Sequence, residues 1–175
     1  MKVFTIILFL FLSITAQSQI NPETKDSLQI TKNKPEIENP AQLIDSVLNY
    51  GKTLVGHRYR YGGAALSGFD CSGFIKFIFH KYGYTLPHCS RDYAQIGEEI
   101  SKDSIQNVKK GDILLFKGRN SKSKRIGHVS IIVEANEKEI LILHSCCNKG
   151  VAVESYTSSG YYPVRLVGIR RLKEL

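Results

Sequence analysis

Three side chains in this sequence are of the types that carry out nucleophilic hydrolysis. Cys71 stands in the segment Gly68–Ile75 (GFDCSGFI), where the pattern predicts the first turn of a helix. His128 and His144 follow later, each in an apolar segment that resembles a strand. A thiol, a base and a residue that orients the base are the components of a cysteine hydrolase. A free buried cysteine is more often an inert hydrophobic residue, but the two histidines favour the catalytic interpretation.

The residues around the cysteine predict a helix with an apolar inward face. Asp70, immediately before the cysteine, is a favourable N-cap residue. The residues that share the predicted inward face are Cys71, Ile75, Ile78 and Tyr82. The thiol therefore lies at the positive end of the helix dipole, which favours its thiolate form.

The two strand-like segments predict that their histidines approach each other. In a strand of period two, His128 shares a face with Ser130, and Ile142 shares one with His144. The three residues 136–138 between the segments have the length of a hairpin turn. With the cysteine helix packed on this hairpin, His128 would accept the thiol proton or hold it in an ion pair. His144 would then orient His128.

An acyl-transfer reaction also needs hydrogen-bond donors for the oxyanion of its tetrahedral intermediate. The backbone amides at the predicted helix start, those of Cys71 and Ser72, are available for this purpose. A tyrosine just before the double-glycine turn offers a hydroxyl as well. Tyr59 and Tyr61 are both candidates for that position.

The order of the predicted elements indicates an α+β domain. Ala41 to Val55 has the pattern of an amphipathic helix, and the cysteine helix follows it as far as about Gly83. The later strand patterns cover residues 112–116, 128–135, 139–145, 151–156 and 164–171. Helices followed by antiparallel strands predict a sheet with the helices packed on one side.

The first 40 residues differ in composition from the rest of the chain. Lys2 and the apolar run Val3–Ile14 predict a secretory signal peptide over residues 1–18, since the run is too short for a comfortable membrane span. Residues 19–40 are polar, contain three prolines and predict a flexible arm. The catalytic domain then occupies residues 41–175. We expect export to the periplasm or cell envelope, with no membrane span after signal cleavage.

Charge and cysteine content limit the classes of partner. The net charge of +8 suits an acidic polymer or an envelope surface. The basic residues are scattered except in the loop Lys117–Arg125, so no nucleic-acid-binding signature is present. If Cys71 is free, three cysteines remain and at most one disulfide forms within the chain. These three are Cys89, Cys146 and Cys147. No Cys-x-x-Cys pair is present, and we expect neither a metal nor a cofactor.

These residues resemble the motifs of the NlpC/p60 family of cell-wall cysteine peptidases. The matching segments, in order, are Tyr59–Gly63, Phe69–Phe74, Leu86–Pro87, Gly111–Ile113, Gly127–Val129 and His144–Ser145. The resemblance implies a papain-like α+β fold and hydrolysis of amide bonds in peptidoglycan stem peptides or cross-links. The layout most resembles the small, single-domain Spr-like murein endopeptidases, and we expect a monomer.

The resemblance also implies roles for individual residues. The implied catalytic residues are Cys71, His128 and His144. Tyr59 matches the family tyrosine that lies beside the thiol, while Asp70 and Ser72 match positions that help to bind the stem peptide. On a wall-bound substrate we expect Asp70 to serve mainly as the helix cap. The chain departs from the family pattern at His88-Cys89 and at Cys146-Cys147.

Other functions remain open from the sequence. Nothing in it separates cleavage of the γ-D-glutamyl–diaminopimelate bond from cleavage of a D-alanyl–diaminopimelate cross-link. A CHAP-type N-acetylmuramoyl-L-alanine amidase also has a cysteine followed by a histidine, but its third group is usually Glu, Asn or Asp rather than His144. A non-catalytic envelope binding module of the same fold would not need the intact trio. A redox or metal-binding protein would use the other three cysteines.

Overall fold

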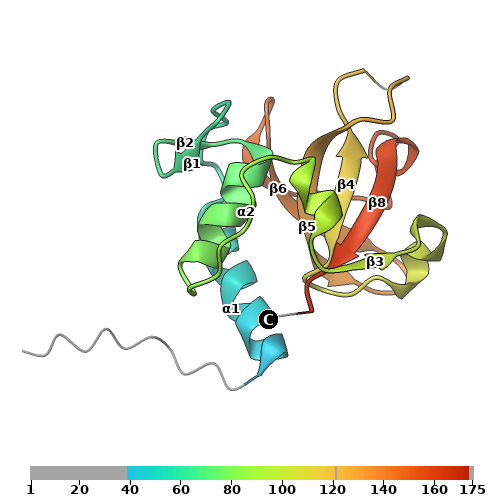
Figure 1. The fold of residues 1–175 in the computed structure, drawn as a ribbon, viewed down its shortest axis with the longest axis horizontal. Helices are drawn as coiled ribbons and strands as arrows, with labels where there is room; N and C mark the ends of the chain where they lie inside the picture. Colours follow the sequence, from blue (N-terminus) through green and yellow to red (C-terminus); the bar gives the residue numbers. More distant parts are fainter. Residues whose placement is uncertain (1–38, 121, 174–175) are drawn as a thin grey trace, which may run out of the picture. The chain divides into compact units, whose positions relative to one another are not determined.

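The computed structural model describes residues 39–120 and 122–173, which form a layer of helices against an antiparallel sheet (Figure 1). This confirms the α+β class. Helix α1 (Pro40–Thr53) and helix α2 (Cys71–His80) precede the strands of the main sheet. The predicted signal peptide and nearly all of the predicted arm lie outside the described residues. No helix within the described ranges is long and apolar enough to cross a membrane.

The main sheet has six antiparallel strands in the order β3-β8-β4-β5-β6-β7. The strands are β3 (Glu98–Ile100), β4 (Ile113–Lys117), β5 (Ile126–Ala135), β6 (Ile140–Cys146), β7 (Gly150–Ser155) and β8 (Leu166–Arg171). A small hairpin, β1 (Ala64–Ala65) with β2 (Gly68–Phe69), precedes α2. The 3-10 helices are η1 (Asp92–Gln95), η2 (Lys102–Asn107) and η3 (Pro163–Arg165). The predicted strand patterns correspond to β4 through β8.

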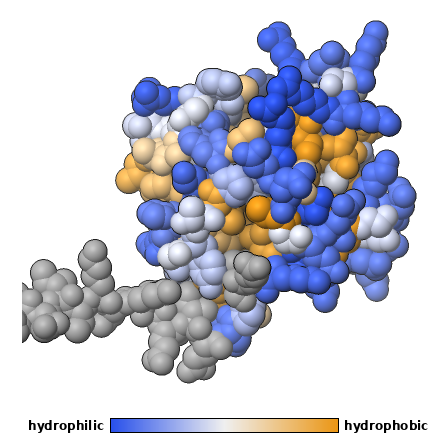
Figure 2. Space-filling model, in the orientation of Figure 1, coloured by the Kyte–Doolittle hydropathy of each residue, from blue (hydrophilic) through white to orange (hydrophobic). Residues whose placement is uncertain are grey.

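Both faces of the main sheet are covered, because successive strand residues point to opposite sides. Leu115, Ile131 and Leu143 face α1 and α2 and are almost completely buried. Their neighbours Leu114 and Ile132 belong to a second buried cluster on the opposite face. The face of the molecule in Figure 2 is largely hydrophilic, with some apolar side chains in view between α2 and the sheet.

Strands β5 and β6 pair over only part of their length, and this creates room for the start of α2. Their ladder ends before it reaches either histidine. The start of α2 and the residues before it contact both of the unpaired halves. The Val129 N–H of β5 hydrogen-bonds to the Cys71 thiol, and the Ser145 hydroxyl of β6 donates to the Phe69 carbonyl at 2.8 Å. The Cys71 thiol therefore lies beside Val129, the residue that follows His128 on β5.

Candidate active site

Asp70 caps α2, as predicted, and several hydrogen bonds hold its carboxylate. Oδ1 accepts from the Gly73 N–H at 2.6 Å and from the Ser72 hydroxyl at 3.0 Å. Oδ2 accepts from the Gly62 N–H at 3.0 Å and lies 3.4 Å from the His88 imidazole. The cap thus joins the start of the helix to the double-glycine turn and holds the adjacent cysteine in place.

We expect Asp70→Asn to lower the free energy of unfolding by about 1 to 3 kcal/mol. An amide accepts at one atom only, so its NH2 group would face the N–H of either Gly62 or Gly73. Urea denaturation measures the effect, and Asp92→Asn at an exposed position is the matched control. Unchanged stability with an activity loss of about 100-fold or more would contradict the capping role and support substrate binding.

The Cys71 thiol is mostly buried, with 7% of the residue exposed. Burial raises the pKa of the thiol to about 11, although the Val129 N–H and the amides at the helix start lower it. The expected stabilisation of the thiolate is therefore wrong, because desolvation outweighs the helix terminus. The resting site holds a neutral thiol.

The histidines of β5 and β6 contact each other, as the strand periodicity predicted. His128 Nε2 lies 2.8 Å from His144 Nδ1. Burial and the neighbouring His144 lower the pKa of His128 to about 3, and burial lowers the pKa of His144. Both imidazoles are neutral near pH 7. A site with a neutral thiol and neutral imidazoles favours proton transfer during attack over a preformed ion pair.

His144 is buried and His128 partly buried, and because both are neutral they should make the protein less stable in acid. In the unfolded chain each titrates near pH 6.5, so below that pH the unfolded state binds more protons than the folded state. The free energy of unfolding therefore has its full value above about pH 6.5. It decreases as the pH falls toward the lowered pKa values of the two histidines in the folded state. We expect a loss of about 2 kcal/mol or more in the free energy of unfolding between about pH 7 and 5.

Urea denaturation over that range measures this pH dependence. The exposed His80 provides the control, because His80→Gln should retain the wild-type dependence. His128, whose pKa is lowered to about 3, should carry a large share of it. A free energy of unfolding that is constant from about pH 7 to 5 would contradict the assignment of neutral imidazoles.

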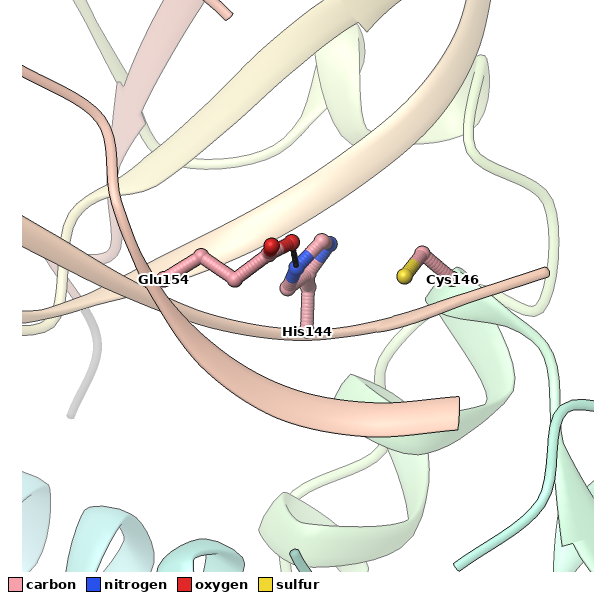
Figure 3. A group of neighbouring side chains, drawn as sticks. All are labelled: His144, Cys146 and Glu154. Atoms are coloured by element: carbon pink, nitrogen blue, oxygen red, sulfur yellow. Dashed lines mark hydrogen bonds and ion pairs between the residues drawn. The ribbon is translucent and has the colours of Figure 1, made fainter. Parts of the chain in front are cut away.

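Glu154 of β7 lies behind the histidine pair. The sequence patterns did not indicate it as a site residue. Its Oε2 is 2.8 Å from His144 Nε2 (Figure 3) and accepts from the Tyr162 hydroxyl at 2.5 Å. The Lys149 ammonium donates to Oε1 at 2.5 Å. Burial raises the pKa of Glu154, but the bonds from Lys149, Tyr162 and His144 outweigh it and hold the pKa at about 2. This carboxylate is therefore ionised.

A cleft of about 750 Å³ connects the site with solvent. Tyr59, Cys71 and His128 line it. Asp70 and Ser72 do not line it, and both are buried and hydrogen-bonded to each other. Of the three side chains expected to contact substrate, only Tyr59 faces the cleft.

Tyr59 rather than Tyr61 lies next to the thiol. Burial raises the pKa of Tyr59, as do nearby Cys147 and Cys71, so its hydroxyl remains protonated. Tyr61 is 92% exposed and does not line the cleft. The structure therefore separates the two tyrosine candidates that the sequence left open.

His144, Cys146 and Glu154, which Figure 3 draws together, offer ligand atoms that all lie within 4.8 Å of one another. Their contacts favour hydrogen bonding over metal coordination. His144 Nε2 is bonded to the carboxylate, and Lys149 already supplies that carboxylate with a cation. All four cysteines of the chain are free thiols. The chemistry of the site is therefore that of a thiol and two imidazoles.

A thiol at a helix start, set near a histidine pair on an antiparallel sheet, is the arrangement of a cysteine hydrolase. Residues 56–171 match the profile of the NlpC/P60 family, and the chain belongs to that family. This confirms the resemblance noted in the sequence motifs.

Similar proteins are known from several bacteria. The chain is 31% identical over 140 residues to gamma-DL-glutamyl hydrolase of Bacillus subtilis (strain 168), a match that covers 79% of this chain and 32% of that protein. It is 26% identical over 161 residues to murein DD-endopeptidase MepS/murein LD-carboxypeptidase of Escherichia coli (strain K12), covering 87% and 79%. A crystal structure of an NlpC/P60 family protein from Bacillus cereus ATCC 10987 has a TM-score of 0.61 at 26% identity, covering 73% and 39%. The chain thus spans about a third of the first relative.

Proposed function

We propose that this protein is a peptidoglycan endopeptidase that uses Cys71 to cut an amide bond in a stem peptide or cross-link. The observation that carries the proposal is the hydrogen-bonded pair of His128 and His144, in a site whose cleft also exposes the thiol. Membership of the NlpC/P60 family supports it. The relatives named as murein endopeptidase and glutamyl hydrolase support the substrate class.

In the proposed mechanism, His128 accepts the thiol proton as the sulfur attacks the amide carbonyl. A sulfur–carbon bond forms and the carbonyl oxygen becomes an oxyanion, near the amides of Cys71 and Ser72 and the hydroxyl of Tyr59. The imidazolium then gives its proton to the leaving amine, and a thioester remains. Water, deprotonated by His128, hydrolyses the thioester and restores the thiol.

The charges in the cleft support an anionic peptide substrate. Lys117, Arg119 and Lys149 line it, and Glu154 is the one acidic residue among the described lining residues. Because the Lys149 ammonium forms an ion pair with the Glu154 carboxylate, the charge that remains in the cleft is positive. Stem peptides carry free carboxylates that suit such a surface. Asp70 is engaged in the helix cap, which disfavours a substrate recognised by its free amine and favours wall-bound peptidoglycan.

We also propose that the protein acts in the periplasm or cell envelope. The predicted signal peptide over residues 1–18 and the net charge of +8 support this location. The relatives named for murein support it as well. In this proposal the catalytic domain begins near residue 41, after the polar arm.

Parallel digestion of purified sacculi and of trimmed peptides with a free N-terminal amine tests the substrate class. We expect the full chain to cleave sacculi at least as fast as the trimmed peptides. Mass analysis of the products then distinguishes a γ-D-glutamyl–diaminopimelate cut from a D-alanyl–diaminopimelate cut. Faster cleavage of trimmed peptides would contradict the wall-bound substrate, and release of complete stem peptides from the glycan would identify an amidase instead.

A further inference from the structure

We infer that Glu154 is a positioning residue that sets the tautomers of both histidines, so that His128 presents a lone pair at Nδ1 to the thiol. The inference rests on the proposed function, because it assigns Glu154 a part in that reaction. Its basis is the hydrogen-bonded chain that runs from Glu154 through His144 to His128.

The Glu154 carboxylate fixes the position of the hydrogen on the His144 imidazole. A carboxylate can only accept hydrogen bonds. Because Glu154 Oε2 lies 2.8 Å from His144 Nε2, that nitrogen carries the hydrogen. A neutral imidazole has a single N–H, so His144 Nδ1 is left with a lone pair. Glu154 therefore sets the tautomer of His144.

The tautomer of His144 in turn determines the tautomer of His128. His144 Nδ1 can only accept, so His128 Nε2, at 2.8 Å from it, must donate. The hydrogen of His128 is thereby fixed on Nε2, and its Nδ1 is unprotonated. The opposite tautomer would carry a hydrogen on Nδ1 and could not accept the thiol proton there. The lone pair that His128 needs to accept the thiol proton thus depends on the Glu154 carboxylate, which acts through His144.

The surroundings of Glu154 favour this role over that of an ordinary surface ion pair. The Tyr162 hydroxyl donates to Oε2 and Lys149 donates to Oε1, each at 2.5 Å, so both carboxylate oxygens have partners. Tyr162 is only 8% exposed, and its ring packs edge to face against the His144 imidazole with centroids 5.6 Å apart. A surface pair of Lys149 and Glu154 alone would contribute little to stability and would leave kcat unchanged.

Glu154→Gln tests the inference, because the amide has one acceptor and one donor end. Lys149 attracts the amide oxygen, so the NH2 group faces His144 and Tyr162. The amide then donates to His144 Nε2, which reverses both tautomers. We expect kcat on sacculi to fall by about 10- to 100-fold with KM nearly unchanged. The control Glu137→Gln removes the same charge from an exposed turn and should match wild type.

Nitrogen-15 NMR of the imidazoles in the full-length wild-type protein tests the tautomers directly. We expect both His128 and His144 to be protonated at Nε2 and bare at Nδ1, and Glu154→Gln to reverse this. A wild-type His144 protonated at Nδ1 would overturn the inference, even if the variant fails to fold. So would a folded Glu154→Gln variant with wild-type kcat. A wild-type protein that leaves sacculi intact would instead overturn the proposed function.

Discussion

Replacing Cys71 by alanine or serine should abolish hydrolysis of sacculi, with a loss of about 1000-fold or more, while the domain stays folded. Alanine lacks the nucleophile, and a serine hydroxyl is a far weaker one at the same position. Because the residue is small and lies at the first turn of a capped helix, neither change should disturb the packing greatly. The rate at which soluble muropeptides are released measures the effect, with circular dichroism as the check on folding.

The matched control is Cys147→Ala, since this cysteine is exposed and also lines the cleft. It should keep most of the wild-type rate, because no proposed step uses its thiol. Activity of Cys71→Ala above about a tenth of the wild-type rate would exclude Cys71 as the nucleophile.

The two histidines should differ in how much activity their replacement removes. His128→Ala removes the proposed base, and we expect a loss of about 1000-fold. His144→Gln should cost only about 10-fold, because the amide oxygen can accept from His128 Nε2 while the amide NH2 donates to Glu154. The hydrogen bonds that glutamine would replace are both 2.8 Å long. Comparison of kcat for the two variants measures this difference.

A His144→Gln variant as inactive as His128→Ala would contradict the orienting role of His144. The exposed His80→Gln serves as the control and should retain wild-type kcat. Chelator should leave wild-type activity intact. Loss of activity with EDTA that zinc restores would point to a metalloenzyme at the site.

Much of the fold could be predicted because its strands are regular. The period-two pattern of β5 and β6, with a short turn between them, predicted the hairpin that brings His128 to His144. Strand β3 and the β1–β2 hairpin have three residues or fewer per strand, too short to show a period. Neither could the sequence show that the β5–β6 ladder ends early, because that depends on how the start of α2 packs.

The site was predicted less completely than the fold. The spacing of the residues indicated Cys71 and the histidines as candidates. The position of Glu154 depended on the register between β6 and β7, in which Ile142 lies opposite Glu154. The pKa of the thiol depended on burial, which a helix-dipole argument from sequence does not include. Asp70 was correctly predicted as a cap, yet its bond to the Gly62 N–H required the folded turn.

The most direct test of the central claim is mass analysis of purified sacculi after incubation with wild-type protein and with Cys71→Ala. We expect wild type alone to release new muropeptides, each formed by adding one water across an amide bond of a stem peptide or cross-link. Sacculi left unchanged by wild type, or the same products released by Cys71→Ala, would contradict it.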